Sequence, residues 1–94
     1  MDLEIVINKE DELEINLKGE GHTLMSIIRK ELFNDPSVIN AGYMVKHPLV
    51  KETRFYIKTK KESTPLEALK GALKRLEGQI DEFESTFEVA LSES

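Results

Sequence analysis

Few residues of this 94-residue chain have the types and spacing that catalysis or metal binding requires. The two histidines, His22 and His47, are far apart in the sequence, and neither has a carboxylate beside it at metal-ligand spacing. The acidic residues at 10–12 lie in a polar segment, where solvation explains their charge. The absence of cysteine excludes thiolate ligands, disulfides and a cysteine nucleophile. We therefore expect no catalytic residue, no metal and no cofactor.

The segment GEGHTL, residues 19–24, looks at first like a phosphate-binding loop that opens a helix. The third glycine of a dinucleotide fingerprint is missing, because Leu24 stands in its place. A helix N-terminus can bind an anion without that glycine. A turn followed by a helix explains the same residues without any ligand, and this is the interpretation that we prefer.

The composition is that of one globular domain spanning residues 1–94, with 39% hydrophobic and 33% charged residues. No apolar run approaches the roughly 20 residues that a membrane-spanning helix needs. The chain begins with MDLEIVINKED, which is acidic where a secretory signal peptide is basic, so we expect a cytoplasmic protein.

A cluster of cations lies on and after the second predicted strand pair, although the net charge of the chain is −5. Proteins that bind nucleic acid on their own are usually basic, because neutralised phosphates supply most of the non-specific affinity. Two interpretations stay open: a solvated, charged sheet face, or a nucleic-acid-binding face. The residues are Lys46, Lys51, Arg54, Lys58, Lys60 and Lys61.

Alternating apolar residues predict four strands in two antiparallel hairpins, at about 3–7, 13–17, 38–46 and 53–59. Between the hairpins, apolar residues at helical spacing in HTLMSIIRKELF predict a helix of about 11–13 residues. A second helix closes the chain. The order ββαββα predicts an α+β fold, a two-layer sandwich of a four-stranded antiparallel sheet with both helices on one face.

The C-terminal helix has a clear start at Thr64, Pro65 and Glu67, a capping hydroxyl followed by a proline and a glutamate three residues after the cap. From there, apolar residues recur at alternating spacings of three and four, which is a heptad seam. We predict one long helix over 64–91. The seam consists of Leu66, Leu69, Leu73, Leu76, Ile80, Phe83 and Phe87.

Such a helix would be about 42 Å long at ~1.5 Å per residue. A compact domain of this size has a radius of gyration near 12 Å and a diameter of roughly 30 Å. Phe83 and Phe87 would then extend beyond the sheet, and we expect a second chain to cover them. The alternative is that the helix bends or frays and that the seam is ordinary core packing.

Four segments together carry a resemblance to a known family. They are GE at 19–20, GHTLMSIIRKELF at 21–33, HPL at 47–49 and TPLEAL at 64–69. Their order and spacing resemble the small, alpha-like subunits of cellular RNA polymerases, most of all the archaeal ones. The resemblance extends from Leu3 to about Phe87, which is nearly the whole chain.

The resemblance implies a noncatalytic structural subunit of DNA-directed RNA polymerase, a nucleotidyltransferase. The chain would pair with the larger alpha-like subunit, called D in archaea, and the heterodimer would form the platform on which the other polymerase subunits assemble in transcription. DNA would be reached only indirectly, through the holoenzyme.

The resemblance also implies roles for particular residues. Arg29 and Lys30 correspond to a basic pair that contacts a large subunit. Ser26 departs from the family pattern, which has asparagine at that position. The partner interface would consist of Leu24, Ile27, Ile28, Leu32, Leu69, Leu73, Leu76, Ile80, Phe83 and Phe87.

An alternative function remains open at this point: an autonomous homodimeric binding module, with nucleic acid held on the basic face between Lys46 and Lys61. A homodimer alone would not decide between the two functions. Without its natural partner, a polymerase subunit of this kind can also associate with itself through the same apolar helix face.

Overall fold

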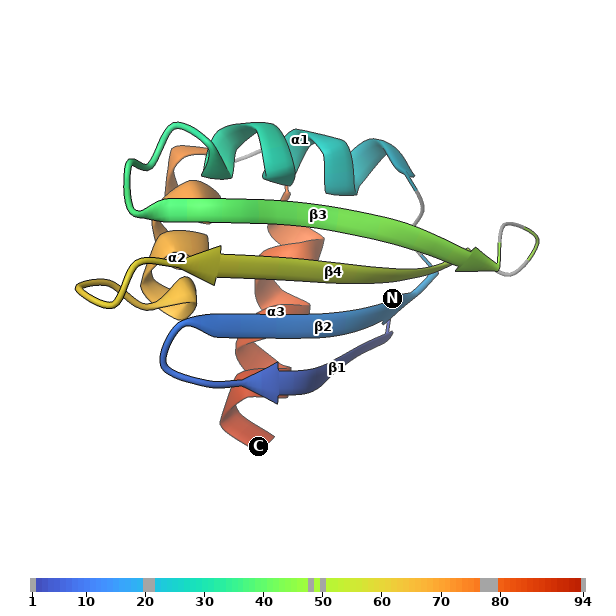
Figure 1. Cartoon of the computed structure of the whole chain (residues 1–94). Helices are drawn as coiled ribbons and strands as arrows, with labels where there is room; N and C mark the ends of the chain where they lie inside the picture. Colours follow the sequence, from blue (N-terminus) through green and yellow to red (C-terminus); the bar gives the residue numbers. More distant parts are fainter. Residues whose placement is uncertain (1, 20–21, 48, 50, 77–79, 94) are drawn as a thin grey trace.

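The computed structural model describes residues 2–19, 22–47, 49, 51–76 and 80–93. These residues form four strands and three helices, shown in Figure 1. The strands are β1 (Asp2–Asn8), β2 (Glu12–Lys18), β3 (Val38–His47) and β4 (Glu52–Thr59), and the helices are α1 (His22–Leu32), α2 (Pro65–Arg75) and α3 (Asp81–Glu93).

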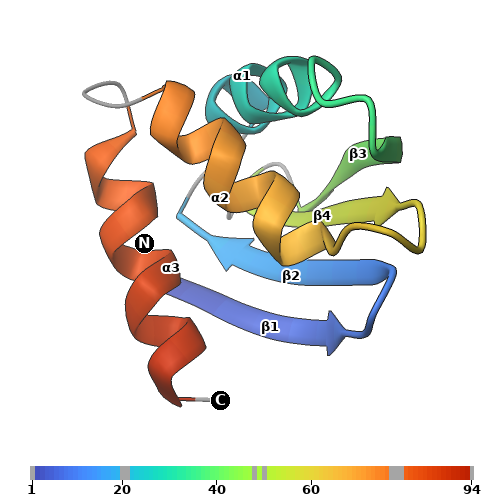
Figure 2. The ribbon, with the colours of Figure 1, turned by 90° about the vertical axis from the view of Figure 1, so that its left-hand side faces the viewer.

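The four strands form one antiparallel sheet in the order β1-β2-β4-β3. Strand β1 pairs with β2, and β3 pairs with β4. Because β2 and β4 also pair with each other in the centre, β1 and β3 are the edge strands of the sheet. Figure 2 shows all three helices on one side of the sheet. The predicted α+β fold with a four-stranded antiparallel sheet is confirmed.

Alternation along the central strands divides the sheet into an apolar face and an open face. Leu13, Ile15 and Leu17 of β2 are buried, while the residues between them are only partly covered. On β4, Phe55 and Ile57 point to the same core. A residue period of two places successive side chains on opposite faces, so the helices need to cover only one face.

Helix α2 begins as the sequence predicts. Thr64 has extended backbone angles, and its hydroxyl accepts a hydrogen bond of 3.2 Å from the backbone N–H of Glu67. Pro65 occupies the first helical position, where its missing N–H costs nothing. The apolar side of α2 supplies Ala68, Leu69, Ala72 and Leu73 to the core.

The prediction of one continuous helix over 64–91 is wrong. Helix α2 ends at Arg75, where the backbone N–H of Leu76 bonds back to Ala72 and Leu73, and α3 begins at Asp81. Residues 77–79 lie outside the described part of the chain.

Local charge accounts for two helices instead of one. The last turn of α2 carries Lys74 and Arg75, and the first turn of α3 carries Asp81, Glu82 and Glu84. Cations stabilise a helix C-terminus and anions an N-terminus, each by about 0.3–1 kcal/mol. In one long helix these acids would lie far from both ends, where the macrodipole does not stabilise them, whereas at the start of a new helix it does.

The two-helix arrangement lets the end of the chain fold back over the sheet. Helix α3 packs on the edge strand β1, on the side of the sheet that also carries α1 and α2 (Figure 2). Phe83 and Phe87 are 2% and 0% exposed, and their rings stack with centroids 6.2 Å apart. The expectation that these two residues extend beyond the sheet without a partner is therefore wrong for the free chain.

The turn between α1 and β3 is held by Asp35. Its carboxylate accepts hydrogen bonds from the backbone N–H of Ser37 at 2.9 Å and from the hydroxyl of Ser37 at 2.7 Å. These bonds favour the ionised form and hold the pKa of Asp35 below its ordinary value of 3.8.

Replacing Phe87 by alanine tests the packing of α3 in the free chain. We expect Phe87→Ala to lower the free energy of unfolding by about 3–5 kcal/mol, because it leaves a cavity in the core. Val89 lies on the same helix and is 55% exposed, so Val89→Ala should change stability by no more than about 0.5 kcal/mol. Urea unfolding measures both. Equal effects of the two variants would contradict the packing of α3 on β1.

Titration of Asp35 predicts a pH dependence with a defined sign. The folded-state pKa is depressed, so the ionised carboxylate stabilises the fold above pH 3.8, and this contribution is lost as the pH falls through the folded-state value. Asp35→Asn should be less stable than the parent chain near neutral pH, and the difference should shrink below pH 3.8. Urea midpoints over a pH series measure it, and a difference that does not vary with pH would refute it.

Candidate subunit interface

The residues of the predicted seam lie together, but they are buried in the core of the free chain. Its six residues proposed for the interface are at most 7% exposed and belong to a single core cluster with the apolar face of the sheet. They are Leu69, Leu73, Leu76, Ile80, Phe83 and Phe87. The apolar surface on which the expectation of self-association rested is therefore covered in the free chain.

Helix α1 supplies one outward-facing candidate. Ile28 and Leu32 are buried in the core, and Leu24 is partly buried against it. Ile27 lies on the other side of the helix and is 37% exposed. Phe33, directly after α1, is also exposed. The sequence reasoning missed Phe33 as a surface residue, although its place after the last helical turn was a signal that it leaves the core stripe.

Arg29 connects α1 to the edge strand β3. Its Nε donates a hydrogen bond of 2.8 Å to the backbone carbonyl of Ala41, and its guanidinium lies 5.1 Å from the centre of the Phe33 ring. The first contact ties α1 to an edge strand of the sheet, and the second is a cation–π interaction. Lys30 is exposed. Contact of this basic pair with a large subunit stays a prediction.

Ser26 uses its hydroxyl within α1, where it donates a hydrogen bond of 3.0 Å to the backbone carbonyl of Thr23. Serine commonly forms such bonds to the preceding turn of a helix.

An ion pair fixes the ends of α1 and α2 relative to each other. Arg75 Nε lies 2.7 Å from Glu31 Oε2, and Arg75 Nη2 donates to the backbone carbonyl of Glu31 at 3.3 Å. Asn34 donates to the same carboxylate at 2.9 Å. The hydrogen bonds from Asn34 and then Arg75 hold the pKa of Glu31 below its ordinary value. Neither helix can shift against the other without breaking these contacts.

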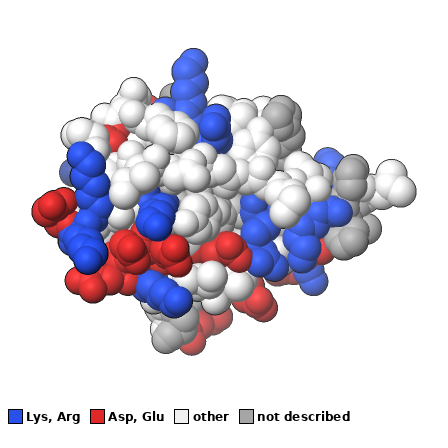
Figure 3. All heavy atoms as spheres, viewed as in Figure 1, with Lys and Arg blue, Asp and Glu red and all other residues white. Residues whose placement is uncertain are grey.

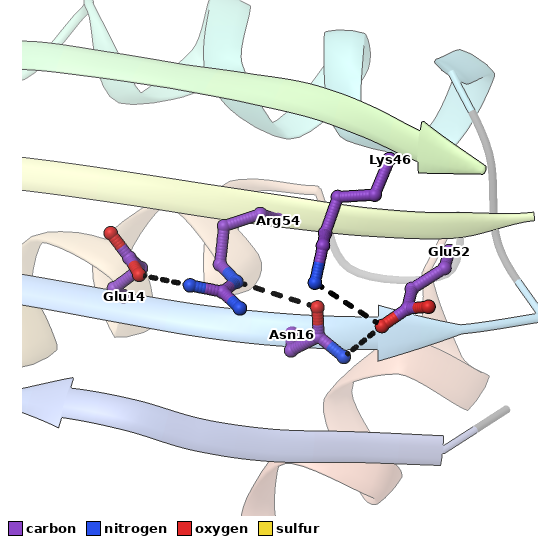
Figure 4. A network of polar contacts seen from close by, with 5 residues as sticks. All are labelled: Glu14, Asn16, Lys46, Glu52 and Arg54. Carbon is purple, nitrogen blue, oxygen red and sulfur yellow. Dashed lines mark hydrogen bonds and ion pairs between the residues drawn. The ribbon is translucent and has the colours of Figure 1, made fainter.

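The open face of the sheet carries a polar network instead of an isolated basic patch (Figure 4). Arg54 Nη1 lies 2.6 Å from Glu14 Oε2, and Arg54 Nε lies 3.4 Å from Asn16 Oδ1. Asn16 Nδ2 donates to Glu52 at 2.9 Å, and Lys46 Nζ lies 3.7 Å from the same carboxylate. Cations and anions therefore alternate across β2, β4 and β3.

This pairing weakens the alternative of a nucleic-acid-binding face. Lys46 and Arg54 have acidic partners in the network, and Lys58 Nζ lies 4.0 Å from Glu12. Figure 3 shows acidic groups between the basic ones on this face. A phosphate backbone would have to displace these carboxylates, or lie beside them, which opposes the electrostatic attraction that such binding needs.

The described residues offer no site for a metal ion. No group of three or more histidine and acidic residues that could hold one occurs among them. The side chains of His22 and His47 lie outside the described part of the structure. Within the same described residues, no helix is long and apolar enough to cross a membrane.

Comparison with known proteins identifies a family for this geometry. Residues 12–86 match the family described as RNA polymerase Rpb3/Rpb11 dimerisation domain. The matched segment includes three of the four strands, both α1 and α2, and the first half of α3.

Three archaeal relatives, each named DNA-directed RNA polymerase subunit Rpo11, illustrate the similarity. The protein of Methanothermobacter thermautotrophicus is 36% identical over 86 residues, 92% of this chain and 98% of its own. That of Methanosarcina barkeri is 38% identical over 92 residues, 98% of this chain and 99% of its own. That of Korarchaeum cryptofilum is 40% identical over 76 residues, 81% of this chain and 78% of its own.

Among solved structures, the fold is similar to the crystal structure of DNA-directed RNA polymerase subunit L from Thermoplasma acidophilum. The TM-score is 0.70, with 98% of this chain and 90% of that chain covered, at 21% identity. At that identity the likeness supports the fold alone. The family match over most of the chain, together with the near full-length relatives, shows that this chain belongs to the RNA polymerase Rpb3/Rpb11 dimerisation domain family.

Proposed function

We propose that the chain is a noncatalytic structural subunit of DNA-directed RNA polymerase. The observation that carries the proposal is the match of residues 12–86 to a dimerisation domain, with relatives of nearly the same length that are named as polymerase subunits. In this role the whole chain acts as one assembly domain in the cytoplasm, and it reaches DNA only through the holoenzyme.

The partner is the larger alpha-like subunit of the polymerase, called D in archaea, and the heterodimer is the platform on which the large subunits assemble. An apolar helix face supports this proposal better than the open face of the sheet does. On the open face, acids and bases are already paired with one another. Interface centres are depleted of charge and enriched in large apolar side chains. On the helix side, Ile27 and Phe33 are exposed in the free chain, and the seam is apolar although it is buried there.

The interface that we propose has two parts. The first is the outer side of α1, where Ile27 and Phe33 are exposed in the free chain. The second is the seam of α2 and α3, from Leu69 to Phe87. A stable interface buries about 800 Å² on each partner. Two exposed side chains fall well short of this area, so the seam must supply much of the contact.

Substitution of Ile27 tests the first part. Because Ile27 is 37% exposed, Ile27→Glu should leave the fold of the free chain intact while it places a charge in the interface. We expect the affinity for the larger alpha-like subunit to fall by about 2 kcal/mol, roughly thirtyfold. Calorimetric titration of the purified chain with that subunit measures the affinity, and circular dichroism checks the fold.

Met44 provides the matched control. It lies on β3 and is 63% exposed, and Met44→Glu should bind the larger alpha-like subunit as the parent chain does. A larger loss from Met44→Glu than from Ile27→Glu would move the interface to the open sheet face. Absence of any complex between the parent chain and the larger alpha-like subunit would remove that partner altogether.

A further inference from the structure

The seam residues of α3 cannot pack on β1 and on a partner at the same time. In the free chain, Phe83 and Phe87 are buried in the core, and α3 makes its main contact with β1. The proposed interface needs the same side of α3. One of the two contacts must therefore give way to the other.

The polar side-chain contacts of α3 differ from those of α1 and α2. Arg75 and Glu31 join α2 to α1 through an ion pair, and Arg29 joins α1 to β3. On α3, the hydroxyls of Ser85, Thr86 and Ser92 donate to backbone carbonyls of the helix itself. Within the described part of the chain, no ion pair ties α3 to β1. The docking of α3 on β1 therefore depends mainly on apolar contact.

Charge adds nothing to the docking of α3 on β1. Helix α3 carries five acidic residues and no basic one, and β1 carries Asp2 and Glu4 and no basic one. Two shallow grooves of about 340 and 280 Å³ lie between the two elements. Along β1, the two acids alternate with Leu3 and Ile5, which pack against the core, so the acids lie on the open face of the sheet. There they line a groove of about 460 Å³ together with Lys18, Lys46 and Arg54. No basic side chain of β1 therefore pairs with the acids of α3.

We propose that the seam face of α3 is an interaction surface with two alternative occupants, β1 in the free chain and an apolar helix of the partner subunit in the heterodimer. The inference rests on the proposed function. The docked helix keeps the seam out of water until the partner replaces β1. Because α3 has only acids around its apolar stripe, the matching face of the partner is apolar with basic residues at its border.

A cross-link that fixes α3 on β1 tests this inference. The chain has no cysteine, so two introduced cysteines form a single defined pair. Leu3 and Ala90 line the same two grooves, one from each element. In the variant Leu3→Cys with Ala90→Cys, a short bifunctional thiol reagent that contains a reducible bond joins the two cysteines. The variant is then titrated with the purified larger alpha-like subunit, once before and once after reduction of that bond.

In the fixed form, the amount of chain that binds the larger alpha-like subunit should fall about a hundredfold relative to the reduced form. Cross-linked chain cannot convert to a form with α3 released, so only unreacted chain, about 1% of the total, should bind, with the affinity of the reduced form. The control is Asn40→Cys with Lys58→Cys, which lie opposite each other on β3 and β4, and the same reagent should not change its binding.

The outcomes separate the inference from the function on which it rests. Equal binding by the fixed and reduced forms would overturn the release of α3 and leave the polymerase function standing. Failure of every form, including the control and the parent chain, to bind the larger alpha-like subunit would overturn the function and the inference together. Hydrogen exchange gives an independent readout: in the free chain, the amides of α3 should exchange faster than those of β2 and β4.

Discussion

Everything in this fold depends on covering the apolar face of a four-stranded sheet. The two central strands carry the buried side chains of Leu13, Ile15, Phe55 and Ile57. The burial of each side chain stabilises the fold, and most of that stabilisation is lost if water reaches it. A chain of this length has room for only a few helices to cover that face. The helices consequently cover the core, and they also carry the apolar stripe that we propose for the contact with another subunit.

Much of the arrangement follows from local sequence rules. The alternation of Leu13, Ile15 and Leu17 fixes one face of β2, and a shift of one residue would expose the whole set. The start of α2 at Thr64 was predictable because capping by a hydroxyl and the fixed backbone angle of Pro65 act within a single turn. Interactions between residues this close in the sequence can be predicted from the sequence itself.

The end of α2 was harder to predict because a heptad seam does not show where one helix ends and the next begins. Spacings of three and four persist from Leu73 through Phe83 whether one helix or two carry them, since both arrangements turn the same residues inward. The charges were the better guide. Lys74 and Arg75, followed by Asp81 and Glu82, mark a helix end and then a helix start. The position of α3 on β1 involves residues at opposite ends of the chain, which no local rule reports.

The candidate site shows the same division. The sequence pattern identified which residues form an apolar stripe, and the structure places the whole stripe in one cluster. The pattern could not show what packs against the stripe. An apolar stripe that covers the chain's own sheet and one that contacts another subunit have the same residue types and spacing. A subunit that must exist before it is assembled needs its apolar face covered at both stages. Docking of α3 on an edge strand that has no basic side chain meets that need, since it covers Phe83 and Phe87 in the free chain and leaves the acids of α3 to a partner with basic residues.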